Sequence, residues 1–416
     1  MNREIKIVIG ANYGDEGKGL VTAALAKEAI QAKKDTLVIC SNGGAQRGHT
    51  VDWSVNERHV FHHFGSGIFS GADTYIAPQF MINPIIFCKE YEELSEVFNR
   101  HMLRPNIYVN KDCRVTTIYD VLFNRLIEEE RGSNKHGSCG LGIFETFNRN
   151  KTRYAFTFDD IYTRTYNYID HIDQVKYYLN QTKEFFKKRA IDLGFPKEKY
   201  ESILNNKAYF YNFIDDLINM CNKTTLINNP TYFLDNYNTI IIENAQGLLL
   251  DMDKEDTVHK TPSSTGLKNI YDCLPSDIIK DSEIEVCYVT RTYMTRHGAG
   301  EFPTECSHWE LCPTMDIRLN DLTNIPNPYQ DEIRFGTLDI SDFLARIEND
   351  FHNYKPNEQT KMSIAITHED EVKQPVSNKV FTNHCDYLYK FIGKYGSFIK
   401  IDTQNNNTKI GDYKWI

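Results

Sequence analysis

Long apolar runs, paired cysteines and an excess of positive charge are all missing from this 416-residue chain. No apolar run approaches the roughly 18 residues that a membrane-spanning helix needs, which excludes a helical integral membrane protein. None of the ten cysteines belongs to a CxxC pair, so neither a zinc site nor a disulfide framework is indicated. The first ten residues, MNREIKIVIG, run directly into a strand-like segment without a signal-peptide pattern. We therefore expect reduced thiols and a cytoplasmic protein.

The charge of the chain limits its partners. It has 47 Lys and Arg against 57 Asp and Glu, a formal net charge of −10. This balance argues against broad binding of nucleic acid or of anionic membranes. A phosphate site must then be local, built from backbone amides and a few cations. With 41% hydrophobic and 25% charged residues, the composition is that of a globular protein and excludes a disordered, collagen-like or coiled-coil chain.

The chain opens with the pattern of an α/β nucleotide-binding unit. Ile5–Ile9 is a β-branched run, the glycine-rich segment Gly10–Gly19 follows, and apolar residues then recur at helical spacing. Leu37–Cys40 has the composition of a second buried strand and leads into another glycine-bearing segment, Ser41–Thr50. Further strands are predicted at Ile107–Val109, Thr239–Ile242, Ile284–Val289, Met362–Ile366 and Phe398–Ile401. These patterns favour an α/β fold with a large, mostly parallel central sheet flanked by helices.

Helices are predicted at Ile118–Glu130 and Val175–Leu193 from their apolar spacing. The span from about Asp159 to Tyr237 is rich in Tyr, Asn and Lys, has helical periodicity and carries no chemical motif. We interpret it as a helical excursion from the sheet. Because no repeat, low-complexity tract or linker is evident, residues 1–416 are predicted to form one domain with helical insertions.

The segment Gly10–Gly19, GANYGDEGKG, has the composition of a phosphate-binding loop. Glycines let backbone amides approach an anion, a helix follows at once, and Lys18 supplies a point charge. It is P-loop-like but not a standard P-loop, because Asn12 and Gly19 stand where that pattern requires Gly and Ser or Thr. Asp15 and Glu16 would repel a phosphate unless a metal or a proton transfer needs them. Taken alone, the segment could equally be a solvated turn between strand and helix.

The second glycine segment, NGGAQRGHT, changes this interpretation. GDEGKG followed some thirty residues later by this segment resembles the adenylosuccinate synthetase family, whose members carry GDEGKG and a GGxNAGHT-type loop. Further segments resemble the family's GTTGRGIG, EGAQGTLLDID, VTSSNT and TRVGAGPFPTE motifs, in the same order. They are Gly137–Ile143 (GSCGLGI), Glu243–Asp253 (ENAQGLLLDMD), Thr261–Thr265 (TPSST) and Thr295–Glu305 (TRHGAGEFPTE).

The resemblance implies a two-step reaction. GTP phosphorylates the 6-oxygen of IMP, and aspartate then displaces that phosphate to form adenylosuccinate. Asp15 is expected to take the N1 proton and to contact Mg²⁺, whose shell the Gly48 carbonyl completes. His49 is expected to act as the acid that stabilises the γ-phosphate in transfer, and Lys18 to hold phosphate. The chemistry is reasonable, since removing the N1 proton makes O6 nucleophilic and a proton donor stabilises charge during phosphoryl transfer.

The resemblance also implies a nucleotide pocket. Gln246 and Thr261 match contacts to the monophosphate, and Arg153 matches an arginine that enters the partner subunit's phosphate site, which implies a homodimer. Asp370, in THED, matches the acid that reads guanine through its N1–H and 2-amino group. Arg334 is the survivor of the arginines that grip aspartate. The other positions carried over as nucleotide-binding are Gly14, Glu16, Gly17, Gly19, Gln46, Ser138 and Cys139.

The departures from the family pattern gather around the amino donor and the sugar. Leu141 and His297 replace an arginine and a valine, Cys139 a threonine and Gln46 an asparagine, while Glu332 replaces an arginine that contacts both aspartate and ribose. Three functions therefore remain open. The first is adenylosuccinate synthesis or a near relative of it. The second is the phage-type synthesis of succino-2-aminoadenylate from (d)GMP, and the third is a catalytically retired nucleotide sensor.

Overall fold

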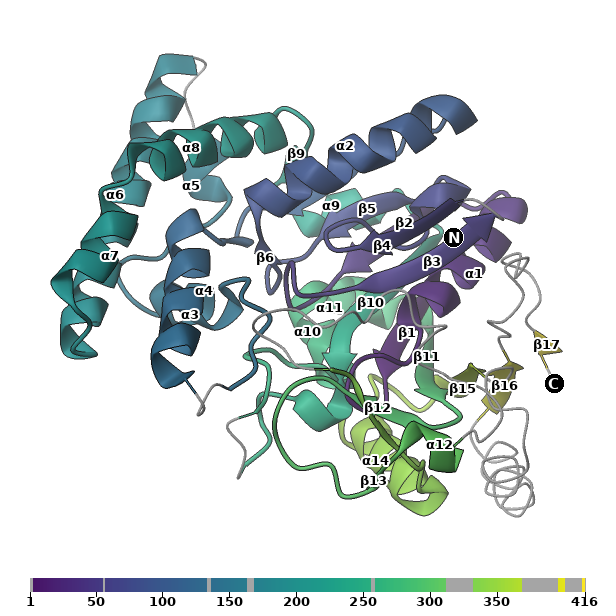
Figure 1. The fold of residues 1–416 in the computed structure, drawn as a ribbon. Helices are drawn as coiled ribbons and strands as arrows, with labels where there is room; N and C mark the ends of the chain where they lie inside the picture. Colours follow the sequence, from purple (N-terminus) through teal and green to yellow (C-terminus); the bar gives the residue numbers. More distant parts are fainter. Residues whose placement is uncertain are drawn as a thin grey trace.

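The computed structural model of the chain describes residues 3–54, 57–132, 136–162, 168–255, 259–311, 332–368, 396–400 and 414–415. Its centre is a ten-stranded sheet (Figure 1). In sheet order the strands are β17 (Lys414–Trp415), β16 (Gly396–Lys400), β15 (Lys361–Thr367), β11 (Ser282–Arg291), β1 (Arg3–Gly10), β10 (Thr239–Gly247), β2 (Thr36–Cys40), β5 (Asp73–Ile76), β7 (Ile107–Asn110) and β9 (Thr225–Ile227). All neighbouring pairs are parallel except β16 with β17. The predicted α/β class is therefore confirmed.

The strands predicted from the sequence each overlap one strand of this sheet. Central strands such as β2, TLVIC, are buried along their whole length, as expected when helices cover both faces of a parallel sheet. The sequence analysis did not predict β5, β9 or β17. These strands have only four, three and two residues, too few to give a clear pattern.

Side chains of β1 alternate between two helical layers, because successive residues of a strand point to opposite faces. Ile7 packs in a cluster with α10, α11 and α14, whereas Val8 packs with Val21 of α1. The helices of the described residues outside the excursion are α1 (Lys18–Gln31), α2 (Pro84–His101), α3 (Ile118–Arg131), α4 (Ile143–Asn150), α10 (Ile270–Cys273), α11 (Ser276–Lys280), α12 (His308–Leu311) and α14 (Ile340–Tyr354). None of the helices in the described ranges is both long and apolar enough to cross a bilayer.

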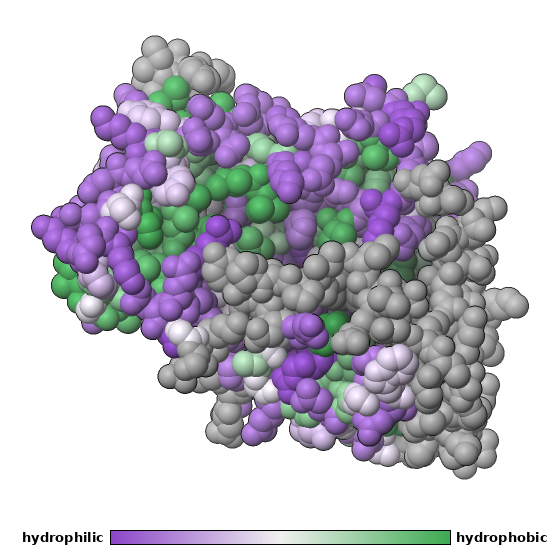
Figure 2. Space-filling model, in the orientation of Figure 1, coloured by the Kyte–Doolittle hydropathy of each residue, from purple (hydrophilic) through white to green (hydrophobic). Residues whose placement is uncertain are grey.

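Residues 159–237 leave the sheet and return to it. Their described elements are α5 (Asp159–Tyr162), α6 (Tyr168–Asp192), α7 (Lys197–Leu204), α8 (Lys207–Cys221), β9 and α9 (Pro230–Leu234). Figure 1 shows α6, α7 and α8 at the left, beside α3 and α4 and away from the sheet. The span is not wholly helical, because β9 pairs with β7 and extends the sheet. Ile191 and Leu193 are exposed in this region, as is Phe144 on the neighbouring α4, and Figure 2 shows apolar surface on the same side.

Three small sheets complete the described fold. They are the hairpin β3 (His49–Ser54) with β4 (Glu57–Phe61), the pair β6 (Met81–Ile82) with β8 (Arg114–Val115), and β12 (Met294–Arg296), β14 (Arg334–Gly336) and β13 (Glu305–Cys306). The hairpin matters most for the site, because β3 begins at His49. In the described part of the chain, all eight cysteines are unbridged thiols, as expected.

Candidate active site

The glycine segments after β1 and β2 and the ENAQG segment of β10 lie at one edge of the central sheet. Five neighbouring strands, β15, β11, β1, β10 and β2, run parallel, so their carboxyl ends lie along the same edge. The glycine loop follows β1, the histidine-bearing loop follows β2, and the ENAQG segment closes β10. In open α/β sheets this edge is where ligands bind.

The loop after β1 is held together by its own charged residues. The buried carboxylate of Glu16 accepts from the backbone amides of Asn12 at 2.9 Å and Gly14 at 2.8 Å through one oxygen. Lys18 Nζ lies 3.0 Å from the other oxygen of Glu16 and donates to the Gly14 carbonyl at 2.6 Å. The Lys18 side chain is fully buried. In this structure its polar contacts are therefore within the loop, and a contact with phosphate remains a prediction.

Asp15 presents the accessible carboxylate of this loop. Its side chain is 24% exposed, whereas that of Glu16 is 2% exposed. Its backbone carbonyl accepts a hydrogen bond from Arg291 Nε at the end of β11, which fixes the loop to the neighbouring strand. Its Oδ2 lies 3.7 Å from His297 Nε2. Of the two acids in the loop, Asp15 is thus the one placed to meet a substrate.

Gly17 permits close contact between the loop and β15. Its φ of +88° belongs to the left-handed region, and a Cβ there would lie 3.0 Å from Thr367 Cγ2. Thr367 Oγ1 in turn donates to the Glu16 carbonyl at 2.6 Å. A side chain at position 17 would therefore be strained and would press on Thr367. The turn at Gly17 leads directly into α1, which begins at Lys18.

His49 is paired with a carboxylate that the sequence analysis did not single out. His49 Nδ1 lies 2.7 Å from Glu243 Oε1, which also accepts from Ser66 Oγ. The backbone amide of Ser66 and the guanidinium of Arg47 reach the other oxygen of Glu243, at 3.1 and 3.3 Å. The signals in the sequence are that Glu243 follows three isoleucines in the strand TIIIENAQG and that it opens the segment Glu243–Asp253, which resembles a family motif. The structure places this acid beside the predicted catalytic histidine.

The charges of this pair follow from burial and neighbours. Burial lowers the pKa of His49 to about 4, although Glu243 acts in the opposite direction. Burial would raise the pKa of Glu243, but the charges of Arg47 and His49 lower it to about 2. Near neutral pH the resting site therefore holds an ionised Glu243 and a neutral His49. Because the carboxylate can only accept, His49 carries its proton on Nδ1.

Two glutamines at the sheet edge have the properties of ligand contacts. Both amide atoms of Gln46 are buried, and neither has a hydrogen-bond partner among the described residues. Gln246 has a positive φ of 64°, and a Cβ on Gly14 would lie 3.1 Å from its Cα, so its backbone packs directly on the loop after β1. A buried amide without partners is costly unless a ligand completes its hydrogen bonds.

The remaining predicted positions fall into three groups. Ser138 Oγ accepts from Asn124 Nδ2 at 3.0 Å, and burial raises the pKa of the neighbouring Cys139 thiol. Their loop contacts the loop that follows β12, because a Cβ on Gly137 would lie 3.3 Å from Ala299 N. Thr261 is buried, and its amide donates to Leu250 at 2.9 Å.

The last group consists of residues that are exposed, are bonded to another side chain or lie outside the described residues. Arg153 is exposed; its NH2 donates to Tyr154 OH at 3.0 Å, and its guanidinium carbon lies 5.0 Å from the ring centroid of the same tyrosine. Arg334 is clamped by Glu305 through two hydrogen bonds of 2.8 and 2.5 Å. Glu332 is exposed. Asp370 lies outside the described residues.

Comparison with known proteins identifies the family of the chain. The family model described as adenylosuccinate synthetase matches residues 7–339, four fifths of the chain. The chain belongs to the adenylosuccinate synthetase family. The adenylosuccinate synthetase of Lactobacillus acidophilus is 29% identical over 301 residues, which are 72% of this chain and 64% of the relative, just under two thirds of its length. That of Borrelia duttonii is 27% identical over 408 residues, 95% of this chain and 82% of the relative.

Two solved structures share the fold. A fully ligated adenylosuccinate synthetase from Plasmodium falciparum superposes with a TM-score of 0.63 at 19% identity, covering 88% of this chain and 77% of that one. The succinoaminodeoxyadenylate synthetase of cyanophage S-2L, bound to dGMP and to dATP as an energy donor, gives a TM-score of 0.62 at 15% identity. It covers 100% of this chain and 95% of that one. The adenylosuccinate synthetase fold thus extends over the described sheet.

The described part of the chain contains no cluster of three or more His, Cys, Asp or Glu side chains that could bind a metal ion by themselves. The Mg²⁺ that the sequence resemblance predicts would require fewer protein ligands. Mg²⁺ prefers hard oxygen donors and is commonly held by one or two carboxylates together with substrate phosphates. The accessible Asp15 carboxylate and the carbonyl of the exposed Gly48 are donors of this chemistry.

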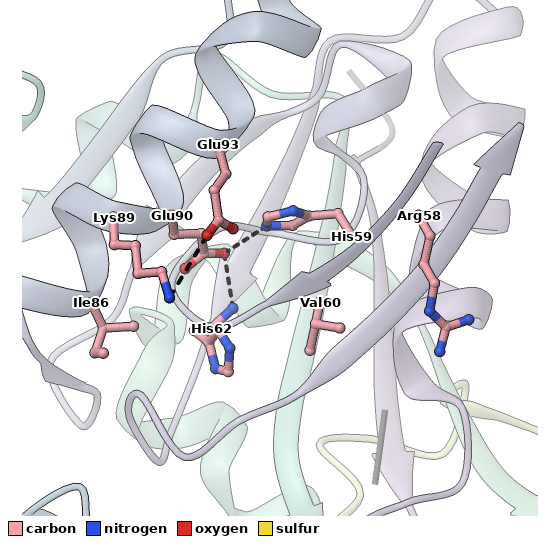
Figure 3. Close-up of a pocket in the computed structure, with 8 residues that line it drawn as sticks. All are labelled: Arg58, His59, Val60, His62, Ile86, Lys89, Glu90 and Glu93. Atoms are coloured by element: carbon pink, nitrogen blue, oxygen red, sulfur yellow. Dashed lines mark hydrogen bonds and ion pairs between the residues drawn. The ribbon is translucent and has the colours of Figure 1, made fainter. Parts of the chain in front are cut away.

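A separate cavity of about 330 Å³ opens between β4 and α2 (Figure 3). It is lined by Arg58, His59, Val60, His62, Ile86, Lys89, Glu90 and Glu93. No predicted site residue lines it. Its buried acid, Glu90, accepts from the backbone amides of His62 and His63 at 2.8 Å each. The cavity adjoins the histidine-bearing loop at its edge, where His62 Nδ1 lies 2.9 Å from the Ala45 carbonyl and Val60 pairs with Thr50 across the hairpin. We therefore place the active site at the sheet edge.

Proposed function

We propose that the protein is a GTP-dependent ligase that phosphorylates the 6-oxo group of IMP and replaces it with aspartate, giving adenylosuccinate. The observation that carries the proposal is the pairing at the sheet edge. An accessible carboxylate, Asp15, follows β1, and a carboxylate-bound imidazole, His49, follows β2, with a glycine loop that opens a helix beside them. Membership of the adenylosuccinate synthetase family supports the same reaction.

In the first step Asp15 acts as the general base. It accepts the N1 proton of the purine, and the electron pair released to the ring makes O6 the nucleophile. O6 forms a bond to the γ-phosphorus while the bond from that phosphorus to the β-phosphate oxygen breaks, leaving GDP. The 24% exposure of the Asp15 side chain supports this role, because a base must reach the substrate.

His49 stabilises the phosphoryl group in transfer. With Nδ1 directed at Glu243, the ring presents Nε2 as the nitrogen available to the phosphate. The negative charge of that phosphate favours the protonated imidazole, and Glu243 stabilises the imidazolium that forms. Mg²⁺, held by Asp15 and the Gly48 carbonyl, would neutralise charge on the phosphate oxygens. In the second step the aspartate amine attacks C6 and the phosphate leaves.

Two further parts belong to the proposal. The protein acts as a homodimer in which Arg153 reaches the partner subunit's site, and the exposure of Arg153 supports this. GTP is the phosphate donor, read by Asp370. Sedimentation analysis of the purified protein tests the first of these. A monomer with full activity would contradict a shared site.

A second candidate function is the formation of succino-2-aminoadenylate from (d)GMP. It is favoured by the acidic Glu332 at a position that contacts aspartate and ribose in the family, and by Arg334, whose guanidinium is already engaged by Glu305. A carboxylate beside a purine can accept from a 2-amino group, which guanine has and hypoxanthine lacks. The accessible Asp15 argues for the first candidate, because the phage enzymes commonly carry serine there.

A substrate screen separates the candidates. The purified protein is incubated with IMP, GMP, dIMP or dGMP, each with aspartate, Mg²⁺ and either GTP or ATP, and the products are identified by mass spectrometry. We expect adenylosuccinate from IMP, and formation of this product at least about 100-fold slower with the Asp15→Asn variant under the same conditions. A succinylated product from GMP or dGMP alone would establish the second candidate. Nucleotide binding by calorimetry without any product would overturn both and indicate a sensor.

A further inference from the structure

A fully buried arginine, Arg47, lies two residues before His49, and its side chain has no exposed surface. Its NH1 donates to Glu243 Oε2 at 3.3 Å, and its NH2 donates to the Phe64 carbonyl. The guanidinium carbon also lies 6.0 Å from the ring centroid of Phe80. A buried charge is tolerated only when it is paired, and Glu243 is the carboxylate at ion-pair distance.

The two carboxylate oxygens of Glu243 form hydrogen bonds with different partners. Oε1 is bonded to His49 Nδ1 and to Ser66 Oγ. Oε2 is bonded to Arg47 NH1 and to the Ser66 amide. Arg47 therefore fixes one end of the carboxylate, and the planar geometry of the group then fixes the direction of the oxygen that meets His49.

We propose that Arg47 is a positioning residue for His49, acting through Glu243. It holds the carboxylate so that His49 keeps its proton on Nδ1 and turns Nε2 to the phosphoryl group. The inference rests on the proposed function for its catalytic consequence, but the effect on the His49 ring is a property of the protein alone. A partner behind a catalytic imidazole sets both the tautomer and the ring orientation.

A purely structural role makes a different prediction. If Arg47 only anchors the loop after β2, its loss should lower stability without changing the state of the His49 ring. The chain offers a matched control, Arg149, which is also fully buried and paired with one carboxylate, Asp120, at 2.9 and 2.8 Å. No bond links Asp120 to His49 among the described residues.

The test compares the whole protein with its Arg47→Met, Arg47→Lys and Arg149→Met variants. Methionine keeps the volume of the side chain and removes its charge, whereas lysine keeps the charge. Melting temperatures identify variants that are folded. Nitrogen NMR of protein carrying labelled histidine, with His49→Gln to assign the signal, reports which ring nitrogen carries the proton. Steady-state kinetics with the substrates found in the screen separate kcat from KM.

We expect Arg47→Met to disturb the Nδ1–H signal of His49 and to lower kcat by about 10- to 100-fold, the range expected when a catalytic group is slightly misplaced. The KM values should change by less than about threefold, because no substrate contact is removed. Arg47→Lys should restore part of the signal and of kcat. Arg149→Met should lose stability but leave the His49 signal unchanged.

Two results would overturn the proposal. One is a folded Arg47→Met variant with wild-type kcat and an unchanged His49 signal. The other is a loss of activity in that variant with the His49 signal unaltered, which would assign Arg47 to the fold alone. If the wild-type protein turns over none of the nucleotides, the proposed function fails, but the NMR comparison still decides whether Arg47 positions His49.

Discussion

His297 Nε2 lies 3.7 Å from Asp15 Oδ2, so the carboxylate predicted to act as the base faces an imidazole. His297 follows β12 and stands where the family motif TRVGAG has valine. The neighbouring Gly298 carbonyl accepts from Arg334 NH1 at 3.2 Å, which ties this loop to β14. This contact connects the loop after β1, which keeps the family's GDEGKG motif, with a position at which the chain departs from the family pattern.

The first prediction concerns the effect of this contact on the Mg²⁺ concentration that activity requires. A cation that binds Asp15 must displace the imidazole, so His297→Val should lower the Mg²⁺ concentration for half-maximal activity by about two- to fivefold. The size follows from the weak energy of partly exposed ion pairs, about 0.2–1 kcal/mol. Titration of activity with Mg²⁺ measures it. His352→Val is the control, because His352 makes a similar 3.6 Å contact with Glu348 within α14. An equal change in both variants would contradict the prediction.

The second prediction concerns the proposed base and acid. Asp15→Asn and His49→Asn should each lower turnover by at least about 100-fold, since each removes a proton-transfer or charge-stabilising group. Nucleotide affinity, measured by calorimetry, should change much less. Near-wild-type turnover in either variant would refute the role given to that residue.

The third prediction concerns the loop after β1. Gly17→Ala should destabilise the protein by more than about 1–2 kcal/mol, the cost of a left-handed backbone for a residue with a Cβ, because the new methyl group also meets Thr367. Gly71→Ala isolates the backbone cost. Gly71 has a φ of +95° and no atom within 4 Å of an added Cβ. Denaturant unfolding of the two variants gives the difference, and equal losses would show that Thr367 adjusts without cost.

The fourth prediction concerns the pH dependence of stability. Burial raises the pKa of Asp350 from its usual 3.8 to about 6, although Tyr288 OH and the Leu267 amide donate to its carboxylate. The folded state thus holds the proton more tightly than the unfolded chain. The stabilisation is complete below pH 3.8 and is lost as the pH rises through 6.

Asp350→Asn removes this proton linkage. As the pH rises from 4 to 7, the wild type should therefore lose up to about 3 kcal/mol of unfolding free energy relative to the variant. Urea unfolding at a series of pH values measures the gap. A constant difference between the two proteins across this range would contradict a raised pKa at Asp350.

The fifth prediction concerns the phosphate donor. If Asp370 reads guanine, the wild type should prefer GTP to ATP, and Asp370→Asn should reduce that preference by about 10- to 100-fold, the value of one paired polar contact. Activity with either donor should persist. Glu369→Gln, a charge change at the adjacent position, is the control. Equal use of GTP and ATP by the wild type would refute the assignment.

The sequence by itself determined the class of fold and the chemistry of the loops. Strand, glycine loop and helix follow one another within the first 31 residues, and local periodicity is sufficient to identify such units. Residue types that bind phosphate or transfer protons, such as Asp15 and His49, are visible within single motifs. Short edge strands were not predictable, because β9 has only three residues and owes its form to pairing with β7.

The tertiary structure alone decided which of these groups act together. Glu243 is 194 residues away from His49, yet the two side chains touch because β10 lies next to β2 in the sheet. Arg47 carries no signal in the sequence that predicts burial, yet its side chain is fully buried in the fold. Arg334 appears available to a substrate until the pairing of β13 with β14 brings Glu305 against it. Local sequence favours the position of most strands along the chain, but the order of strands in a parallel sheet is a long-range property that only packing fixes.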